Sequence, residues 1–249
     1  MSAETKLLIY SLFSLLFTIF ILLICKNKIK TEETKQKVLK MIAVVTVLLH
    51  YSSLWVDYFT TGTAEVDGSM LLPIYPCNIC MWLLVIVAFI KKQETKLSRI
   101  IIEFTGFAGL VCGTLGLILN ENFLATPSFL DYYSLKGLLS HSTLILGCIY
   151  LFVMNYININ VLSNMFSCAA GLIFFVVDGF VINMLYKLFN MDSPNAMYLE
   201  ENPFPAIPFL NTLTMGLAAM LLLFVFTSIY EQIKLPREKR WYQELKKGK

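Results

Sequence analysis

Cysteine and histidine side chains are the residues of this chain best suited to chemistry. Cys77 follows Pro76 directly, and the two histidines are His50 and His141. A histidine beside a cysteine can take up the thiol proton, and the thiolate can then attack an ester carbonyl to form a thioester. Asp178 could hold such a histidine in one tautomer, as the third member of a catalytic triad does. These residue types suggest acyl-transfer chemistry, with Cys77 as the nucleophile and one of the two histidines as the base.

Cys77 also begins a Cys-x-x-Cys sequence that ends at Cys80. This spacing occurs in thiol redox sites and in metal sites. A zinc site needs further ligands, which only the two histidines could supply, so we expect no metal and no cofactor. A membrane thiol oxidase needs a second cysteine pair, but the other cysteines are expected far from Cys80. These are Cys25, Cys112, Cys148 and Cys168.

The composition indicates which kind of protein carries these residues. Hydrophobic residues make up 57% of the 249 residues and charged residues only 15%, whereas soluble globular proteins have about 25% charged residues. Mean hydropathy is +0.68, so a lipid bilayer must cover much of the apolar surface. The net charge of +3 gives no indication of a nucleic-acid partner. The chain is therefore expected to be an all-α, polytopic membrane protein.

Seven apolar segments are long enough to cross a bilayer, which takes about 20 residues at a rise of about 1.5 Å each. Backbone groups in hydrocarbon must pair within their own segment, so each segment is expected to be a helix. The first segment does not resemble a signal peptide, because its basic residues follow the apolar run. We predict one domain, residues 1–249, built as a bundle of seven transmembrane helices. The predicted spans are 6–25, 38–56, 71–90, 100–119, 135–154, 161–186 and 207–230.

Basic residues fall almost entirely on one side of these spans. The segments 26–40 and 91–99 and the tail 231–249 hold seventeen of the twenty lysines and arginines. Cytoplasmic segments of membrane proteins carry an excess of these residues. The N-terminus is therefore predicted outside the cell and the basic tail in the cytoplasm. The opposite side has only Lys6, Lys136 and Lys187.

Polar side chains interrupt the predicted helices mainly in their outer halves. His50, Cys77 and His141 each lie six residues from the outer end of their spans, about 9 Å deep at helical rise. Asp178 lies about 12 Å deep. Hydrogen bonds between helices would explain any single member, but the whole set at one depth favours an outward-facing polar cavity. The residues expected to bind substrate or support the site are His50, Asp57, Asn78, Asn120, Asp178, Asn183 and Asn211.

Two prolines precede Cys77 at the start of the third span. Pro73 and Pro76 lack backbone donors, and such an irregular backbone is tolerated in a membrane only where it is buried in protein or lines water. Cys77 is therefore expected in the first turn of a new helix.

Four glycines at spacings of three and four form a stripe along the fourth span. They are Gly106, Gly109, Gly113 and Gly116. Small residues at this spacing allow close packing between membrane helices. We interpret the stripe, and Glu103 near its inner end, as packing or edge features.

Four segments resemble those of a known family. Residues 71–83 read LLPIYPCNICMWL, residues 50–57 read HYSSLWVD, and residues 140–142 read SHS. Together with the loop 195–203 they are similar to the YwaF-like bacterial integral membrane proteins. The resemblance covers nearly the whole chain from the second span onward.

The resemblance implies lipid chemistry. YwaF-like proteins are related to an animal transmembrane acyltransferase that remodels ether phospholipids, and more distantly to androgen-induced membrane hydrolases. Those relatives pair a nucleophile with a histidine on a later helix, and the matching positions here are Cys77 and His141. The resemblance also implies a multi-pass protein of a bacterial plasma membrane.

Two functions remain open on this reasoning. The leading hypothesis is a membrane-embedded acyl-transfer enzyme or lipid hydrolase that takes an acyl lipid from the outer leaflet. The alternative is a non-enzymatic binding or transport protein with an outward-facing polar cavity. A transporter should have a polar path through the inner half of the bundle as well, and the sequence lacks one.

Overall fold

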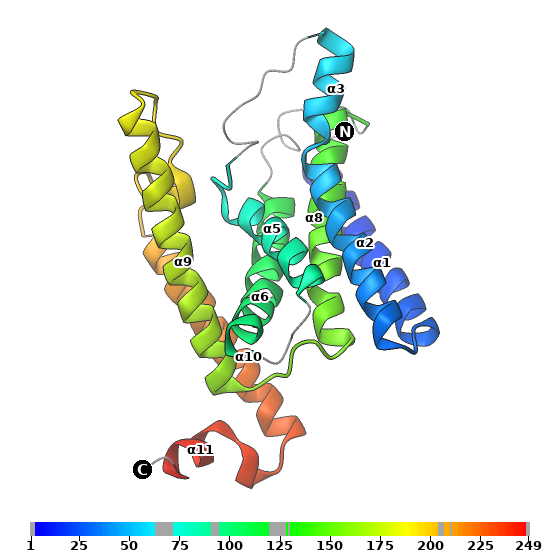
Figure 1. Cartoon of the computed structure of the whole chain (residues 1–249), viewed down its shortest axis with the longest axis vertical. Helices are drawn as coiled ribbons and strands as arrows, with labels where there is room; N and C mark the ends of the chain where they lie inside the picture. Colours follow the sequence, from blue (N-terminus) through cyan, green and yellow to red (C-terminus); the bar gives the residue numbers. More distant parts are fainter. Residues whose placement is uncertain are drawn as a thin grey trace.

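All regular structure in the described part of the chain is helical. The computed structural model describes residues 3–62, 72–90, 95–119, 128, 130–203, 207–209 and 211–247. The predicted all-α class is confirmed within these ranges. Figure 1 places the N-terminus and α3 (Ser52–Thr61) toward the upper end of the molecule and the C-terminus at the lower end. Upper and lower refer to this view throughout.

Six helices among the described residues are long and apolar enough to cross a membrane. Helices α2 (Glu32–His50) and α3 count as one of the six, because a single residue separates them. These helices coincide with six of the seven predicted spans to within a few residues. The other five are α1 (Ala3–Lys28), α6 (Lys96–Ile118), α8 (Tyr132–Val153), α9 (Val161–Leu188) and α10 (Thr212–Lys234).

The third predicted span is represented by a shorter helix, α5 (Pro76–Phe89), of 14 residues. At helical rise it is about 21 Å long, less than the hydrocarbon thickness of about 30 Å. The helix begins at Pro76 because proline suits the first helical position, whereas the residue before a proline disfavours helical geometry. Tyr75 accordingly has an extended backbone, with φ −104° and ψ 151°. The sequence therefore overestimated the length of this span.

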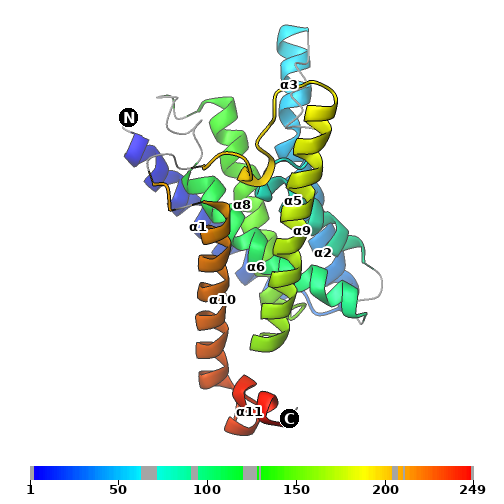
Figure 2. The ribbon, with the colours of Figure 1, turned by 90° about the vertical axis from the view of Figure 1, so that its left-hand side faces the viewer.

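Helix α8 lies at the centre of the bundle and α10 at its edge. α8 packs against α1, α2, α5 and α6. In its most apolar 18-residue stretch 67% of the residues are buried, compared with 11% in that of α10. α9 packs on α6, and α10 packs on α9. Figure 2 shows α10 running along the side of the bundle toward the C-terminus at the lower end. The core that positions the polar side chains is therefore formed by α5, α6 and α8.

The glycine stripe of α6 allows this close contact with α8. A methyl group on Gly109 would lie 2.5 Å from Cys148 Sγ, and one on Gly113 would lie 2.9 Å from Ile145 Cγ1. A methyl group on Gly116 would overlap the ring of His141. These distances leave no room for a larger side chain, so the packing interpretation of the stripe is confirmed.

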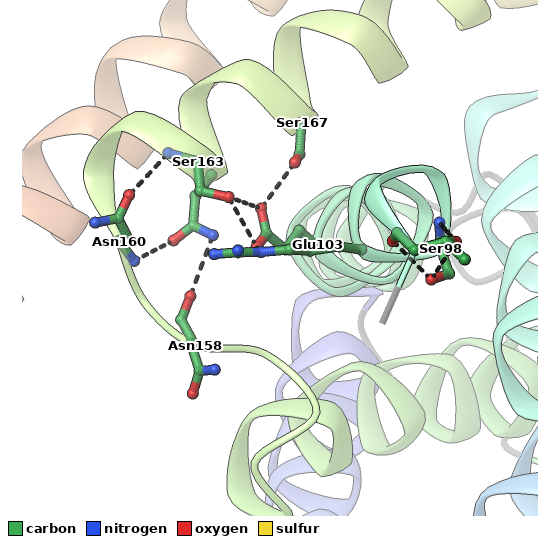
Figure 3. A network of polar contacts seen from close by, with 9 residues as sticks. Ser98, Glu103, Asn158, Asn160, Ser163 and Ser167 are labelled. Carbon is green, nitrogen blue, oxygen red and sulfur yellow. Dashed lines mark hydrogen bonds and ion pairs between the residues drawn. The ribbon is translucent and has the colours of Figure 1, made fainter. Parts of the chain in front are cut away.

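Glu103 is a buried carboxylate that joins α6 to α9. Its oxygens accept hydrogen bonds from Ser163 Oγ at 3.0 Å and Ser167 Oγ at 2.7 Å, and Arg99 Nε donates at 2.8 Å. Figure 3 shows Ser163 and Ser167 pointing from α9 toward Glu103. Asn160 caps α9 beside this network by accepting a bond from the Ser163 amide. The interpretation of Glu103 as a packing residue is therefore consistent with its contacts.

A second buried carboxylate, Glu231 near the end of α10, joins two further helices. One oxygen accepts from the backbone amide of Val161 at 2.7 Å, where α9 begins. The other accepts from the amide of Trp241 at 2.8 Å, where the short helix α11 (Trp241–Lys247) begins. The 3-10 helix η2 (Arg237–Lys239) lies between α10 and α11. Both carboxylates thus accept hydrogen bonds from neighbouring helices near the lower end.

Candidate functional site

His141 presents a free nitrogen inside the bundle. Its Nδ1 lies 2.8 Å from the carbonyl oxygen of Gly137, one turn earlier on α8. A carbonyl can only accept, so Nδ1 carries the proton and Nε2 is left with a lone pair. Nε2 is buried and has no hydrogen-bond partner among the described residues. The imidazole is thus held as one tautomer with its basic nitrogen unoccupied.

Cys77 lies in the first turn of α5, as predicted from Pro76. Its thiol donates a hydrogen bond of 3.4 Å to Oδ1 of Asn78, which is buried. Cys112 on α6 is a near neighbour of this thiol.

Cys77 and His141 approach the same stretch of α6. Gly116, which the His141 ring contacts, and Cys112, which interacts with Cys77, are four residues apart on this helix. Four residues correspond to about 6 Å along a helix axis. Because Nε2 has no partner, the two side chains are not hydrogen-bonded to each other in the structure.

Four thiols gather where α5, α6 and α8 meet, and we call them the thiol cluster: Cys77, Cys80, Cys112 and Cys148. Cys112 is a near neighbour of Cys80, and a methyl group on Gly109 would lie 3.6 Å from Cys80 Cβ and 2.5 Å from Cys148 Sγ. Cys148 Sγ donates to the Thr105 carbonyl at 3.4 Å, and its electrostatic neighbours include Cys80 and Cys112.

The prediction that Cys112 and Cys148 lie far from Cys80 is therefore wrong. The sequence indicated how deep each cysteine lies but not which way its helix is turned, and the glycine stripe brings the three helices close together. None of these four cysteines forms a disulfide bond. No group of side chains able to hold a metal ion is found among the described residues.

A second group of polar residues joins α2 and α3 to α8 at the upper end. We call it the upper polar cluster: His50, Ser53, Asp57, Tyr133 and Lys136. Lys136 Nζ donates to Ser53 Oγ at 2.8 Å, and the Tyr133 hydroxyl donates to Asp57 at 2.7 Å. His50 lies within electrostatic range of both Lys136 and His141. The upper polar cluster thus lies near His141.

Sequence reasoning overlooked Lys136, which it counted only as an outer charge. A signal was present, because this lysine precedes His141 by five residues at the start of an apolar segment. Ionisable residues in such segments usually face the protein interior. Ser53 and Tyr133 had no comparable signal.

Of the other candidate residues, Asn183 and Asn211 have structural contacts. Asn183 Oδ1 accepts from the backbone amide of Ala196 at 2.7 Å, and Asn211 caps α10 by accepting from the Thr214 amide. Asp178 Oδ2 is buried without a hydrogen-bond partner among the described residues. Asn120 lies outside the described residues.

Asp178 does not orient His141, which corrects one role expected from the sequence. The Gly137 carbonyl occupies Nδ1, and Nε2 is unpartnered. A backbone acceptor one turn away on the same helix can fix a histidine tautomer without any carboxylate, so the sequence had no reason to exclude this arrangement.

Residues 195–199, which we call the bridge segment, connect three parts of the upper end. They include the 3-10 helix η1 (Ala196–Tyr198). The Met197 amide donates to the Ile74 carbonyl at 2.8 Å, just before α5, and Thr212 Oγ1 donates to the Tyr198 carbonyl at 2.6 Å. Met197 and Tyr198 have φ values of 54° and 55°, which are unfavourable for side chains of this size. The bridge segment is thus held in a strained backbone conformation by its contacts.

A family comparison can now be placed beside this geometry. The model of the TMEM164 family matches residues 1–230. The chain belongs to the TMEM164 family. No curated protein and no solved structure matches it.

The TMEM164-family match covers the thiol cluster, the upper polar cluster and the bridge segment. It ends within α10, before Glu231. The family shown is thus TMEM164 rather than the YwaF-like proteins named from the short motifs. Together with the six apolar helices, the match makes this chain a multi-pass membrane protein.

Proposed function

We propose that this TMEM164-family protein is a membrane-embedded acyl-transfer enzyme or lipid hydrolase, with Cys77 as nucleophile and His141 as general base. The observation that carries the proposal is the state of His141. Its Nδ1 is fixed by the Gly137 carbonyl, and its Nε2 is buried and unpartnered. A base needs a nitrogen free to accept a proton, in a tautomer that does not change.

The reaction begins when His141 Nε2 takes the proton of the Cys77 thiol. The sulfur attacks the ester carbonyl of an acyl lipid, and the lipid alcohol leaves with the proton returned by His141. The products of this half-reaction are a Cys77 thioester and the deacylated lipid. An acceptor hydroxyl, or water, then attacks the thioester while His141 takes its proton, and the proton returns to the thiol. His141 thus acts as base and acid in turn.

The reaction requires Cys77 and His141 to come closer than in the present arrangement. They approach positions about one helical turn apart on α6. Catalytic hydrogen bonds are often long in the absence of substrate and tighten in the complex. The proposal therefore requires the lipid complex to bring the two side chains into contact across α6.

The proposed topology has seven membrane segments, with α5 as a short third one. The upper end then lies outside the cell, because most basic residues lie at the other end. The lipid enters from the outer leaflet of the cell membrane. The two carboxylates of the lower half, Glu103 and Glu231, have helix-joining partners, so they do not favour a transport path.

The test is to look for the thioester and to compare two cysteines. Protein purified with lipid should carry an acyl mass on Cys77 that hydroxylamine removes. Cys77→Ser should lose this mass and most turnover, and His141→Ala should slow acylation by roughly 10²–10⁴-fold. Cys80→Ser is the matched control and should retain the thioester. Equal loss in the two cysteine variants, with both folded, would contradict the proposal and favour a redox role for the thiol cluster.

A further inference from the structure

A groove of about 540 Å³ runs between α9 and α10. This volume is within the range of about 300–1,000 Å³ that small-molecule sites occupy. Its walls are apolar side chains of the two helices, among them Leu172, Phe175, Leu217 and Met220. Along α10 the lining extends from Asn211 to Met220, which is about 13 Å at helical rise.

Polar groups line only the upper end of this groove. The rim consists of Glu200, Glu201, Asn202, Asn211 and Thr212. The bridge segment contributes to the same end through Met197 and Tyr198. A ligand that fits must therefore have a long apolar part and a polar part at one end, as a membrane lipid has.

One wall of the groove is Pro76, the residue before Cys77. The bond from the Met197 amide to the Ile74 carbonyl fixes the bridge segment against the chain that enters α5. The polar end of the groove and the proposed nucleophile are therefore parts of one connected structure.

Gly216 faces the groove without being needed for helix packing. A methyl group on it would meet only Leu172 Cδ1, at 3.9 Å. By contrast, a methyl group on Gly171 or Gly179 would lie within 3 Å of a neighbouring atom. A larger residue at position 216 would thus project into the groove without forcing α9 and α10 apart.

We propose that this groove holds one acyl chain of the lipid substrate, with the ester end at Pro76 and Cys77. The inference rests on the proposed acyl chemistry for the fate of the ester, but occupation of the groove can be tested without it. The occupant is a lipid because the groove lies along two membrane-spanning helices and is polar only at its rim.

The test uses the full chain in phosphatidylcholine nanodiscs that include a phosphatidylcholine with a photoreactive group in one acyl chain. After illumination, mass spectrometry should place the crosslinks on peptides of α9 and α10 that line the groove. Gly216→Phe should lower this crosslinking about tenfold, because its ring would occupy space that the acyl chain needs. Even one methylene group in a hydrophobic pocket changes discrimination by about tenfold or more. Ala218→Phe is the control, because residue 218 lies two positions along the helix and points about 200° away.

Cys77→Ser separates this proposal from the proposed function, since it should abolish the thioester but leave the crosslinks unchanged. If no thioester forms on Cys77 but the crosslinks are present and depend on Gly216, the groove proposal stands and the acyl chemistry is wrong. Crosslinks elsewhere, or equal effects of Gly216→Phe and Ala218→Phe, would overturn the groove proposal. A dimer that buries the groove against a second copy of the chain would also overturn it.

Discussion

Gly116 of α6 and His141 of α8 are in direct contact. A methyl group on Gly116 would lie 2.3 Å from Nε2 and 2.4 Å from Cδ2 of the imidazole. Only glycine leaves this position open, so the backbone of α6 sets how far the ring can turn. The free nitrogen of His141 is therefore positioned by a residue that has no side chain of its own.

Gly116→Ala should impair the proposed acyl transfer without altering any reactive group. The added methyl group must displace the imidazole, and a displacement of about 1 Å can cost roughly 10²-fold in rate. Gly113→Ala is the matched control, because its methyl group would crowd Ile145 Cγ1, at 2.9 Å, and not the imidazole. The rate of thioester formation and the thermal midpoint should be measured for both. If both variants lose activity equally, the position of His141 is not the cause.

Single cysteines should report the proposed orientation. An impermeant maleimide should label Thr61→Cys on intact cells, because position 61 lies at the upper end, which is proposed to be outside. It should label Leu97→Cys only after the membrane is opened. The unsubstituted protein measures the background from the native thiols. The reversed pattern would invert the topology and remove the argument for an outer-leaflet substrate.

Glu103→Gln should destabilise the protein while leaving the proposed site intact. The buried carboxylate accepts hydrogen bonds from Ser163, from Ser167 and from Arg99, whose side chain is 55% exposed. Hydrogen bonds to charged groups each contribute about 1.5–3 kcal/mol. We expect a lower unfolding midpoint in detergent. Glu33→Gln removes a similarly spaced pair with Lys37, but both side chains are more than 70% exposed, so it should have little effect. Comparable losses would show that burial of Glu103 is unimportant.

The pair formed by Lys187 and Glu200 should make stability depend on pH in acid. Lys187 Nζ lies 2.5 Å from Glu200 Oε1, and this bond, followed by one from Ser193, lowers the pKa of the Glu200 carboxyl below its ordinary value of 4.5. A depressed pKa stabilises the folded state above the unfolded-state pKa, and that stabilisation is lost as pH falls through the folded-state value. The gap in thermal midpoint between wild type and Glu200→Gln should therefore shrink as pH falls below 4.5. A constant gap at all pH values would contradict this assignment.

The sequence predicted the depth of residues along their helices better than their direction. Segment length and hydropathy located six spanning helices, because hydrocarbon demands long apolar runs. The rotation of each helix could not be predicted, since membrane helices are apolar on faces toward lipid and toward protein alike. For this reason Cys112 and Cys148 were placed far from Cys80, although the three helices bring them together.

Side-chain roles were also harder to predict than positions. Asn183 and Asn211 occur at the predicted end of the bundle, but their amides fix the bridge segment and cap α10. A single sequence does not distinguish a polar residue that satisfies the backbone from one that faces a ligand. His141 was recognisable only because Cys77 and a second histidine lie at the same predicted depth.

Glu231 sets a time order for biogenesis. The amide that begins α9 receives its partner from a residue 70 positions later in the chain. At a synthesis rate of about 5–20 residues per second, α9 enters the membrane roughly 4–14 seconds before that partner exists. During this interval the Val161 amide lacks the carboxylate that accepts its hydrogen bond in the folded chain. A chain stopped at residue 230, where the family match ends, would lack this acceptor permanently.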